Sequence, residues 1–142
     1  TVIDFTKAIP TVLRPGGLNI SLINKIVKTS YVESNINEKK PESPGLLKKH
    51  YSPNASLRLN ADYPLKGEAW LGFGEDPKNL NNFVKMNLSK NKNLEEAAKN
   101  LFSMLRYLDK KNVKKIAVKK IQNKGIGIAI NDRLNRGAAN KS

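Results

Sequence analysis

The sequence contains no cysteine and only one histidine among its 142 residues. The lack of cysteine excludes disulfide bonds and thiolate metal sites, and one histidine leaves too few ligands for the usual zinc cage. No apolar run approaches the roughly 20 residues that a membrane-spanning helix needs. The chain opens on a β-like stretch without an initiator Met or a signal-peptide pattern. We therefore expect a piece of a longer, cytoplasmic protein with no membrane partner.

Acidic residues are also scarce. The formal net charge is +14, and residues 65–142 carry seventeen Lys or Arg against seven Asp or Glu. Such an excess favours polyanionic partners such as RNA or nucleotides. A lysine- and asparagine-rich proteome explains the same excess without any partner. A non-catalytic basic RNA-binding or regulatory domain is thus one candidate function, and its possible RNA patch comprises Lys114, Lys115, Lys119, Lys120, Arg133 and Arg136.

The first 42 residues resemble the edge of a larger α/β body. Alternation over residues 1–6 and the β-branched run at 11–13 predict two strands joined as a hairpin. Two strands are marginal in water without a partner sheet, and no third strand is apparent nearby. A short helix is expected over 19–27, capped by Asn19 or Ser21. The polar residues 28–42 then indicate an exposed linker.

From residue 53 onward, strand and helix patterns alternate. The clearest helix begins after Asn93, which is a good N-cap, and Glu96 stands at capping-box spacing. The polar run Asn131–Arg133 is expected mid-helix, where a cap, salt bridge or domain contact is favoured over catalysis. This order predicts an α/β domain with a mainly parallel sheet flanked by helices. The expected strands are 56–60, 68–74, 83–89 and 114–121, and the expected helices are 93–111 and 125–139.

Two segments stand out as candidate binding elements. Residues 43–53 combine Pro44 and Pro53 with two lysines, a histidine and a tyrosine, which fits either a plain surface loop or a loop that touches a ligand. Arg14 stands where a strand meets a Pro-Gly-Gly bend. An arginine held there can direct its planar fork at a phosphate, although an exposed arginine at a turn is the simpler interpretation from composition alone.

Three motifs in order resemble the Sua5 family of two-domain threonylcarbamoyl-adenylate synthases. They are the Thr1–Asp4 stretch with Leu13–Gly17, the linker 43–53, and the Gly-Ile-Gly-Ile-Ala-Ile-Asn-Asp-Arg-Leu run at 125–134. The resemblance implies that residues 1–30 are the C-terminal remnant of a YrdC-like catalytic domain. Residues 31–54 would then be the interdomain linker, and 55–142 a Rossmann-like Sua5 domain. Most of the catalytic domain would precede Thr1.

The resemblance also implies a reaction. The family joins L-threonine, bicarbonate and ATP into threonylcarbamoyl-AMP and pyrophosphate, for a modified adenosine beside the tRNA anticodon. It assigns nucleotide contacts to Arg14, Tyr51 and His50, and the edge of the threonine pocket to Thr1. The chain offers no general base or nucleophile of its own, so we expect it to be inactive alone and to hold no cofactor. ATP and Mg²⁺ belong to the complete enzyme, whose further partners are other proteins of the tRNA modification pathway and tRNA itself.

Overall fold

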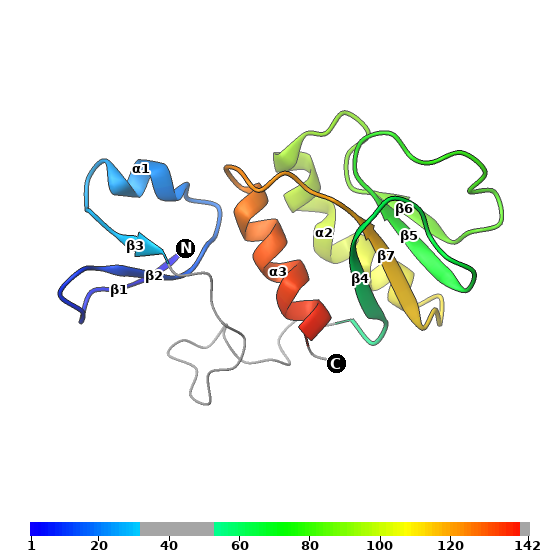
Figure 1. The fold of residues 1–142 in the computed structure, drawn as a ribbon, viewed down its shortest axis with the longest axis horizontal. Coiled ribbons are helices and arrows are strands. Elements are labelled where there is room, and N and C mark those ends of the chain that lie inside the picture. The colour runs from blue at the N-terminus through cyan, green and yellow to red at the C-terminus, as the bar shows by residue number, and fades with distance from the viewer. Residues whose placement is uncertain (32–52, 140–142) are drawn as a thin grey trace.

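The computed structural model describes residues 1–31 and 53–139. These ranges form two units, each with its own sheet, coloured blue to cyan and green to red in Figure 1. In chain order the elements are β1 (Val2–Asp4), β2 (Thr11–Arg14), α1 (Ile20–Asn24), β3 (Ser30–Tyr31), β4 (Ser56–Ala61), β5 (Glu68–Gly72), β6 (Lys85–Asn87), α2 (Leu94–Asp109), β7 (Lys115–Lys119) and α3 (Gly127–Ala139).

The N-terminal unit contains the expected hairpin and one unexpected strand. β1 and β2 pair antiparallel, and Asn19 caps α1 by accepting a hydrogen bond from the Ser21 amide at 2.9 Å. β3 pairs parallel with β2, so the expectation of only two strands was wrong. At two residues, β3 is too short to show an alternating pattern. Its pairing depends instead on the Ser30 amide, which donates to the Pro10 carbonyl at 2.9 Å.

Large apolar side chains remain on the surface of this small unit. Phe5 is 63% exposed and Ile26 is 87% exposed. Five of the nine exposed large apolar residues in the described ranges lie within the first 26 positions. They are Phe5, Ile9, Leu18, Leu22 and Ile26. So many exposed large apolar side chains in so few residues are unusual for a domain that is stable by itself.

The C-terminal unit is the predicted parallel α/β domain. Its four strands follow the order β4-β7-β5-β6, and every neighbouring pair is parallel. Residues that alternate along the strands separate into two cores. Leu71 and Val118 pack with the buried stripes of α2 and α3, whereas Trp70 and Ala117 pack with Leu80. Both helices therefore cover one face of the sheet, and the β5–β6 connection covers the other.

The start of α2 shows a variant of the expected capping box. Asn93 accepts a hydrogen bond from the Glu96 amide at 2.8 Å, as predicted. The Glu96 carboxylate, however, accepts from the Ser89 hydroxyl, and Ser89 Oγ in turn accepts from the Asn93 amide at 3.0 Å. The Ser89 hydroxyl thus stands between the Glu96 carboxylate and the Asn93 amide, which bond directly in a standard capping box. It also links the segment after β6 to the helix.

An ion pair between the buried Glu68 and the partly exposed Arg58 fixes the short crossover between β4 and β5. The Arg58 guanidinium donates to both carboxylate oxygens of Glu68, at 2.9 Å from Nε and 2.6 Å from Nη2. The same carboxylate accepts from the Leu65 amide at 2.8 Å, and Arg58 also donates to the Tyr63 carbonyl. The hydrogen bonds from Arg58 hold the pKa of Glu68 below its usual range despite its burial.

Glu68→Gln is expected to lower the free energy of unfolding by about 2 kcal/mol at pH 7, since it weakens charge-assisted bonds to a buried group. Arg58 keeps 39% exposure of its side chain, so the cost stays below that of a fully buried pair. The folded-state pKa of Glu68 is lowered. Its stabilisation is therefore present above the ordinary value of about 4.3 and is lost as pH falls through the folded pKa.

Urea melts between pH 3 and pH 7 measure this effect. The difference between wild type and Glu68→Gln should shrink toward acid pH, whereas the exposed Glu75→Gln should behave as wild type throughout. A pH-independent difference would show that the carboxylate charge is not what holds the crossover.

Candidate functional site

Arg14 and Thr1, the two predicted site residues of the N-terminal unit, lie beside each other. Arg14 ends β2 and pairs with Val2 across the hairpin. The Thr1 hydroxyl donates to the Leu18 carbonyl at 2.9 Å, which draws the start of the chain over the bend. A Cβ on Gly16 would lie 2.2 Å from the Thr1 amide nitrogen, so the close approach requires glycine there.

The side chain of Arg14 is available to a ligand. It is half-buried at the end of its strand, and no hydrogen bond or ion pair joins it to another residue of ranges 1–31 and 53–139. The other two predicted nucleotide contacts, His50 and Tyr51, lie outside the described residues, as does the linker up to residue 52. Their predicted roles remain predictions.

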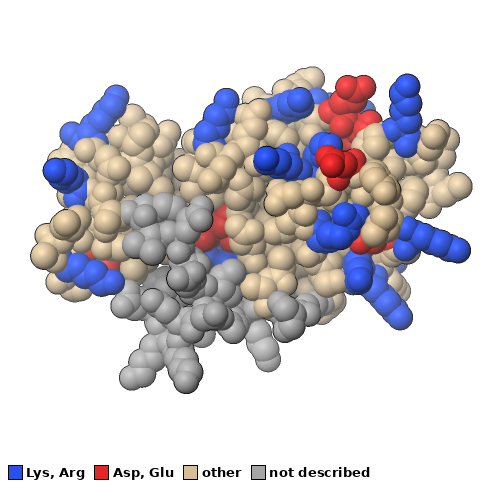
Figure 2. All heavy atoms as spheres, viewed as in Figure 1, with Lys and Arg blue, Asp and Glu red and all other residues tan. Residues whose placement is uncertain are grey.

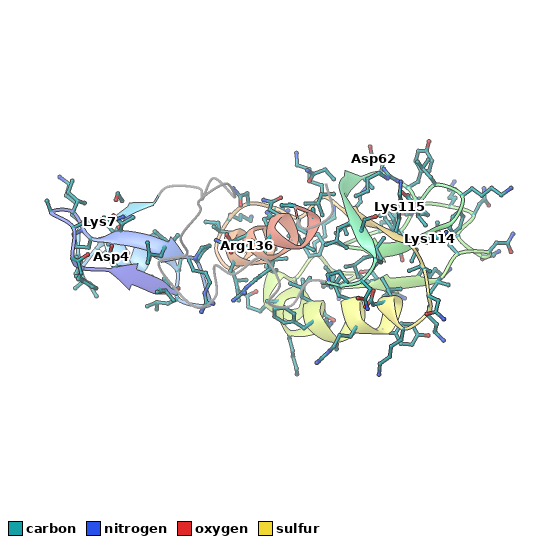
Figure 3. All side chains as sticks on the ribbon, turned by 90° about the horizontal axis from the view of Figure 1, so that it is seen from below. Asp4, Lys7, Asp62, Lys114, Lys115 and Arg136 are labelled. Atoms are coloured by element: carbon teal, nitrogen blue, oxygen red, sulfur yellow. The ribbon has the colours of Figure 1, made fainter. Side chains whose placement is uncertain are left out.

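The six candidate RNA-contacting cations fall into separate groups. Lys114 and Lys115 precede or begin β7, while Lys119 and Lys120 stand at its other end, about 13 Å away at strand spacing. In Figure 3, Arg136 lies on α3, well apart from Lys114 and Lys115. Figure 2 likewise shows Lys and Arg spread over the visible face and interrupted by acidic side chains, not gathered into one cluster.

A cavity of about 360 Å³ lies where β4 and β7 end and α3 begins. This is the carboxyl edge of a parallel sheet, where open α/β folds bind their ligands. No cavity was predicted here from the sequence, although the ends of the predicted strands were the available signal. Its lining combines cations, amides and apolar side chains: Leu59, Asn60, Val118, Lys119, Lys120, Ile121, Asn123, Ile128, Asn131, Asp132, Leu134, Asn135 and Arg136.

The polar residues of α3 make internal bonds at this cavity. Asp132 accepts from Arg136 Nε at 2.9 Å, and both side chains are largely buried. The Asn131 amide donates to the Ile121 carbonyl at 3.2 Å, which fastens the helix to the end of β7. Of the predicted cap, salt bridge or domain contact at Asn131–Arg133, the structure shows a salt bridge, at Asp132.

Gly125, just before α3, and Gly127, its first residue, are glycines for different physical reasons. Gly125 has a φ of +52°, which favours glycine, and its surroundings are open. Gly127 instead lies against the preceding loop, because a Cβ there would stand 2.1 Å from the Gln122 carbonyl oxygen. Together they turn the chain from β7 into the helix that borders the cavity.

Among residues 1–31 and 53–139, no three His, Cys, Asp or Glu side chains form a group that could hold a metal ion. Across the same residues, no helix is both long and apolar enough to pass through a membrane. What these residues provide is a set of groups for binding: Arg14 with the strand ends of the first unit, and the polar cavity of the second.

Comparison with known proteins shows consistent likenesses. The family described as threonylcarbamoyl-AMP synthase, C-terminal domain, matches residues 8–139. A curated threonylcarbamoyl-AMP synthase of Pyrococcus abyssi is 28% identical in an alignment that covers 97% of the chain. A curated threonylcarbamoyl-AMP synthase of Bacillus subtilis is 27% identical in an alignment that covers 99% of the chain. The crystal structure of P. abyssi Sua5 complexed with L-threonine matches 99% of the chain, with a TM-score of 0.79 and 26% identity, and 46% of that structure is covered. The chain spans 45% of the length of either curated relative.

Proposed function

Because the chain belongs to the family of threonylcarbamoyl-AMP synthase C-terminal domains, we propose that it is the C-terminal part of such a synthase. The complete enzyme joins L-threonine, bicarbonate and ATP into threonylcarbamoyl-AMP and pyrophosphate, with loss of one water. The match over residues 8–139 carries this proposal. The product would supply the threonylcarbamoyl group for an adenosine of tRNA. Because the reaction would transfer the adenylyl group of ATP, the enzyme would be a nucleotidyltransferase.

The apolar surface of the N-terminal unit supports a partner domain in cis. A three-stranded sheet with only Val12 and Ile23 among its buried apolar side chains is too small to be stable alone. The exposed Phe5, Leu18 and Ile26 would be covered if β1–β3 extended the sheet of a catalytic domain. The relatives contain further sequence of sufficient length for such a domain, since this chain spans less than half of each.

In this proposal, the chain contributes binding groups to a site that the catalytic domain completes. Arg14 would hold nucleotide phosphate through its planar fork, and Thr1 would border the threonine pocket. His50 and Tyr51 would approach the nucleotide from the linker. ATP brings Mg²⁺ on its phosphates, which neutralises charge as the adenylate forms. The described residues contain no group of three metal-ligating side chains, so none of them is assigned to the ion.

Pyrophosphate release from ATP in the presence of L-threonine and bicarbonate tests the proposal. The chain alone should show none. A chimera is made by placing before Thr1 the part of the P. abyssi relative that precedes the aligned region. This chimera should restore pyrophosphate release. Omitting threonine or bicarbonate from the chimera assay is the matched control. A folded chimera that releases no pyrophosphate, or activity from the chain alone, would overturn this assignment.

The net charge of +14 supports a second candidate, a non-catalytic basic module that contacts RNA. Binding of a tRNA transcript to the chain would then weaken steeply with salt, in proportion to the number of phosphates neutralised. The division of the cations between the two ends of β7 favours the synthase over this candidate.

A further inference from the structure

The described lining of the cavity at the carboxyl ends of β4 and β7 belongs to the C-terminal unit. Its lining residues come from β4, from β7 with the loop that follows it, and from α3. None comes from the unit that carries Arg14 and Thr1. A volume of about 360 Å³ falls within the range of small-molecule pockets. The cavity is therefore separate from the nucleotide contacts assigned to Arg14.

The charge of the lining favours an anion. The described lining contains three cations, Lys119, Lys120 and Arg136, and one carboxylate, that of Asp132. Arg136 binds this carboxylate at 2.9 Å, so the acid is already neutralised within the wall. Lys119 makes an ion pair, at 3.3 Å, with Asp62, whose side chain is 90% exposed. A bridge to so exposed a carboxylate is weak and yields readily to a ligand of higher charge.

The amides of the lining add directional donors and acceptors. Asn60 stands at the end of β4 with a φ of 55°, in the left-handed conformation that suits a turn. Asn123 and Asn131 are joined by a hydrogen bond of 3.3 Å, and Asn135 lies one turn further along α3. No aromatic side chain appears in the described lining. A nucleobase would therefore find no stacking platform, and phosphate groups are the chemistry that the wall matches best.

We propose that this cavity is a binding site for a small, multiply charged phosphate compound, held by Lys119 and Lys120. Its position follows the rule that open parallel sheets bind ligands outside the carboxyl ends of their strands. The start of α3, a helix of 13 residues, borders the same cavity and adds the positive end of its dipole. The site would let the C-terminal unit sense phosphate compounds apart from the synthase chemistry.

Titration calorimetry with inorganic pyrophosphate and tripolyphosphate tests this site in the 142-residue chain. The double variant Lys119→Gln/Lys120→Gln is expected to weaken binding about tenfold or more, because it removes two charge-assisted contacts. Lys114→Gln/Lys115→Gln is the matched control. It removes the same charge from the opposite end of the same strand, and should change the dissociation constant by less than about twofold. Thermal melts of both variants check that each remains folded.

Two further arms separate this site from other sources of phosphate binding. Arg106→Ala should leave the affinity for tripolyphosphate unchanged, since it removes an exposed arginine of α2 that does not line the cavity. Equal weakening by both lysine pairs would reveal general charge attraction and overturn the proposal. Loss of binding in Arg106→Ala alone, or binding of a tRNA transcript without binding of either inorganic probe, would overturn it as well.

Discussion

Arg14→Ala in the chimeric synthase is expected to lower threonine-dependent pyrophosphate release by about 100-fold or more, the usual effect of removing a positioned charged donor from a phosphate-transferring site. The structure gives the reason. Arg14 ends β2 directly before the bend that packs against Thr1. Its side chain makes no hydrogen bond to another residue within the described ranges. A side chain fixed at its base and unpaired at its tip can direct its fork at a phosphate.

Arg14→Lys distinguishes charge from geometry at this position. Lysine keeps the positive charge but lacks the planar pair of donors, so we expect an intermediate loss of activity. Arg106→Ala removes an exposed arginine of α2 and serves as the control, with activity close to that of the parent chimera. If Arg14→Ala retains full activity and is folded, the arginine is a surface residue of a turn and the nucleotide contacts lie elsewhere.

Elements with several turns or alternating residues could be predicted from sequence because their patterns repeat. α2 has an N-cap, an apolar stripe and sixteen residues, so local pattern and packing agree. β3 has two residues and no pattern. It exists because the start of β2 offers free backbone groups beside it, which only the folded chain reveals. The shortening of β6 to three residues has the same origin, since pairing decides where a strand ends.

The candidate site likewise has one part that could be predicted from the sequence and one part that could not. The proximity of Thr1 and Arg14 follows from a predicted hairpin, because antiparallel pairing brings its two ends together. The grouping of the cations could not follow from sequence order. Lys115 and Lys119 are near neighbours in the chain but stand at opposite ends of β7. Conversely, Asn60 and Asn131 are far apart in sequence and line one cavity, because parallel strands bring their carboxyl ends to one edge.

Gly72→Ala is expected to destabilise the C-terminal unit by about 3 kcal/mol or more, through overpacking and loss of hydrogen bonds to a carboxylate. A Cβ at Gly72 would lie 2.1 Å from Asp76 Oδ1 and 2.8 Å from Trp70 Nε1. That same oxygen accepts hydrogen bonds from Trp70 Nε1 at 2.7 Å and from Asn87 Nδ2 at 2.9 Å. The methyl group would therefore displace the acceptor that joins the ends of β5 and β6.

The measurement can separate crowding from backbone strain. Gly125→Ala is the comparison, because Gly125 has a left-handed φ of +52° but open space around it, and we expect a cost of only about 1 kcal/mol. Trp70 is the only tryptophan, so its fluorescence in urea melts reports both the local bond and global unfolding. A shifted native spectrum with a lower midpoint in Gly72→Ala is the expected result. If both variants lose equal stability and the spectrum is unchanged, the Asp76 carboxylate does not organise this edge of the sheet.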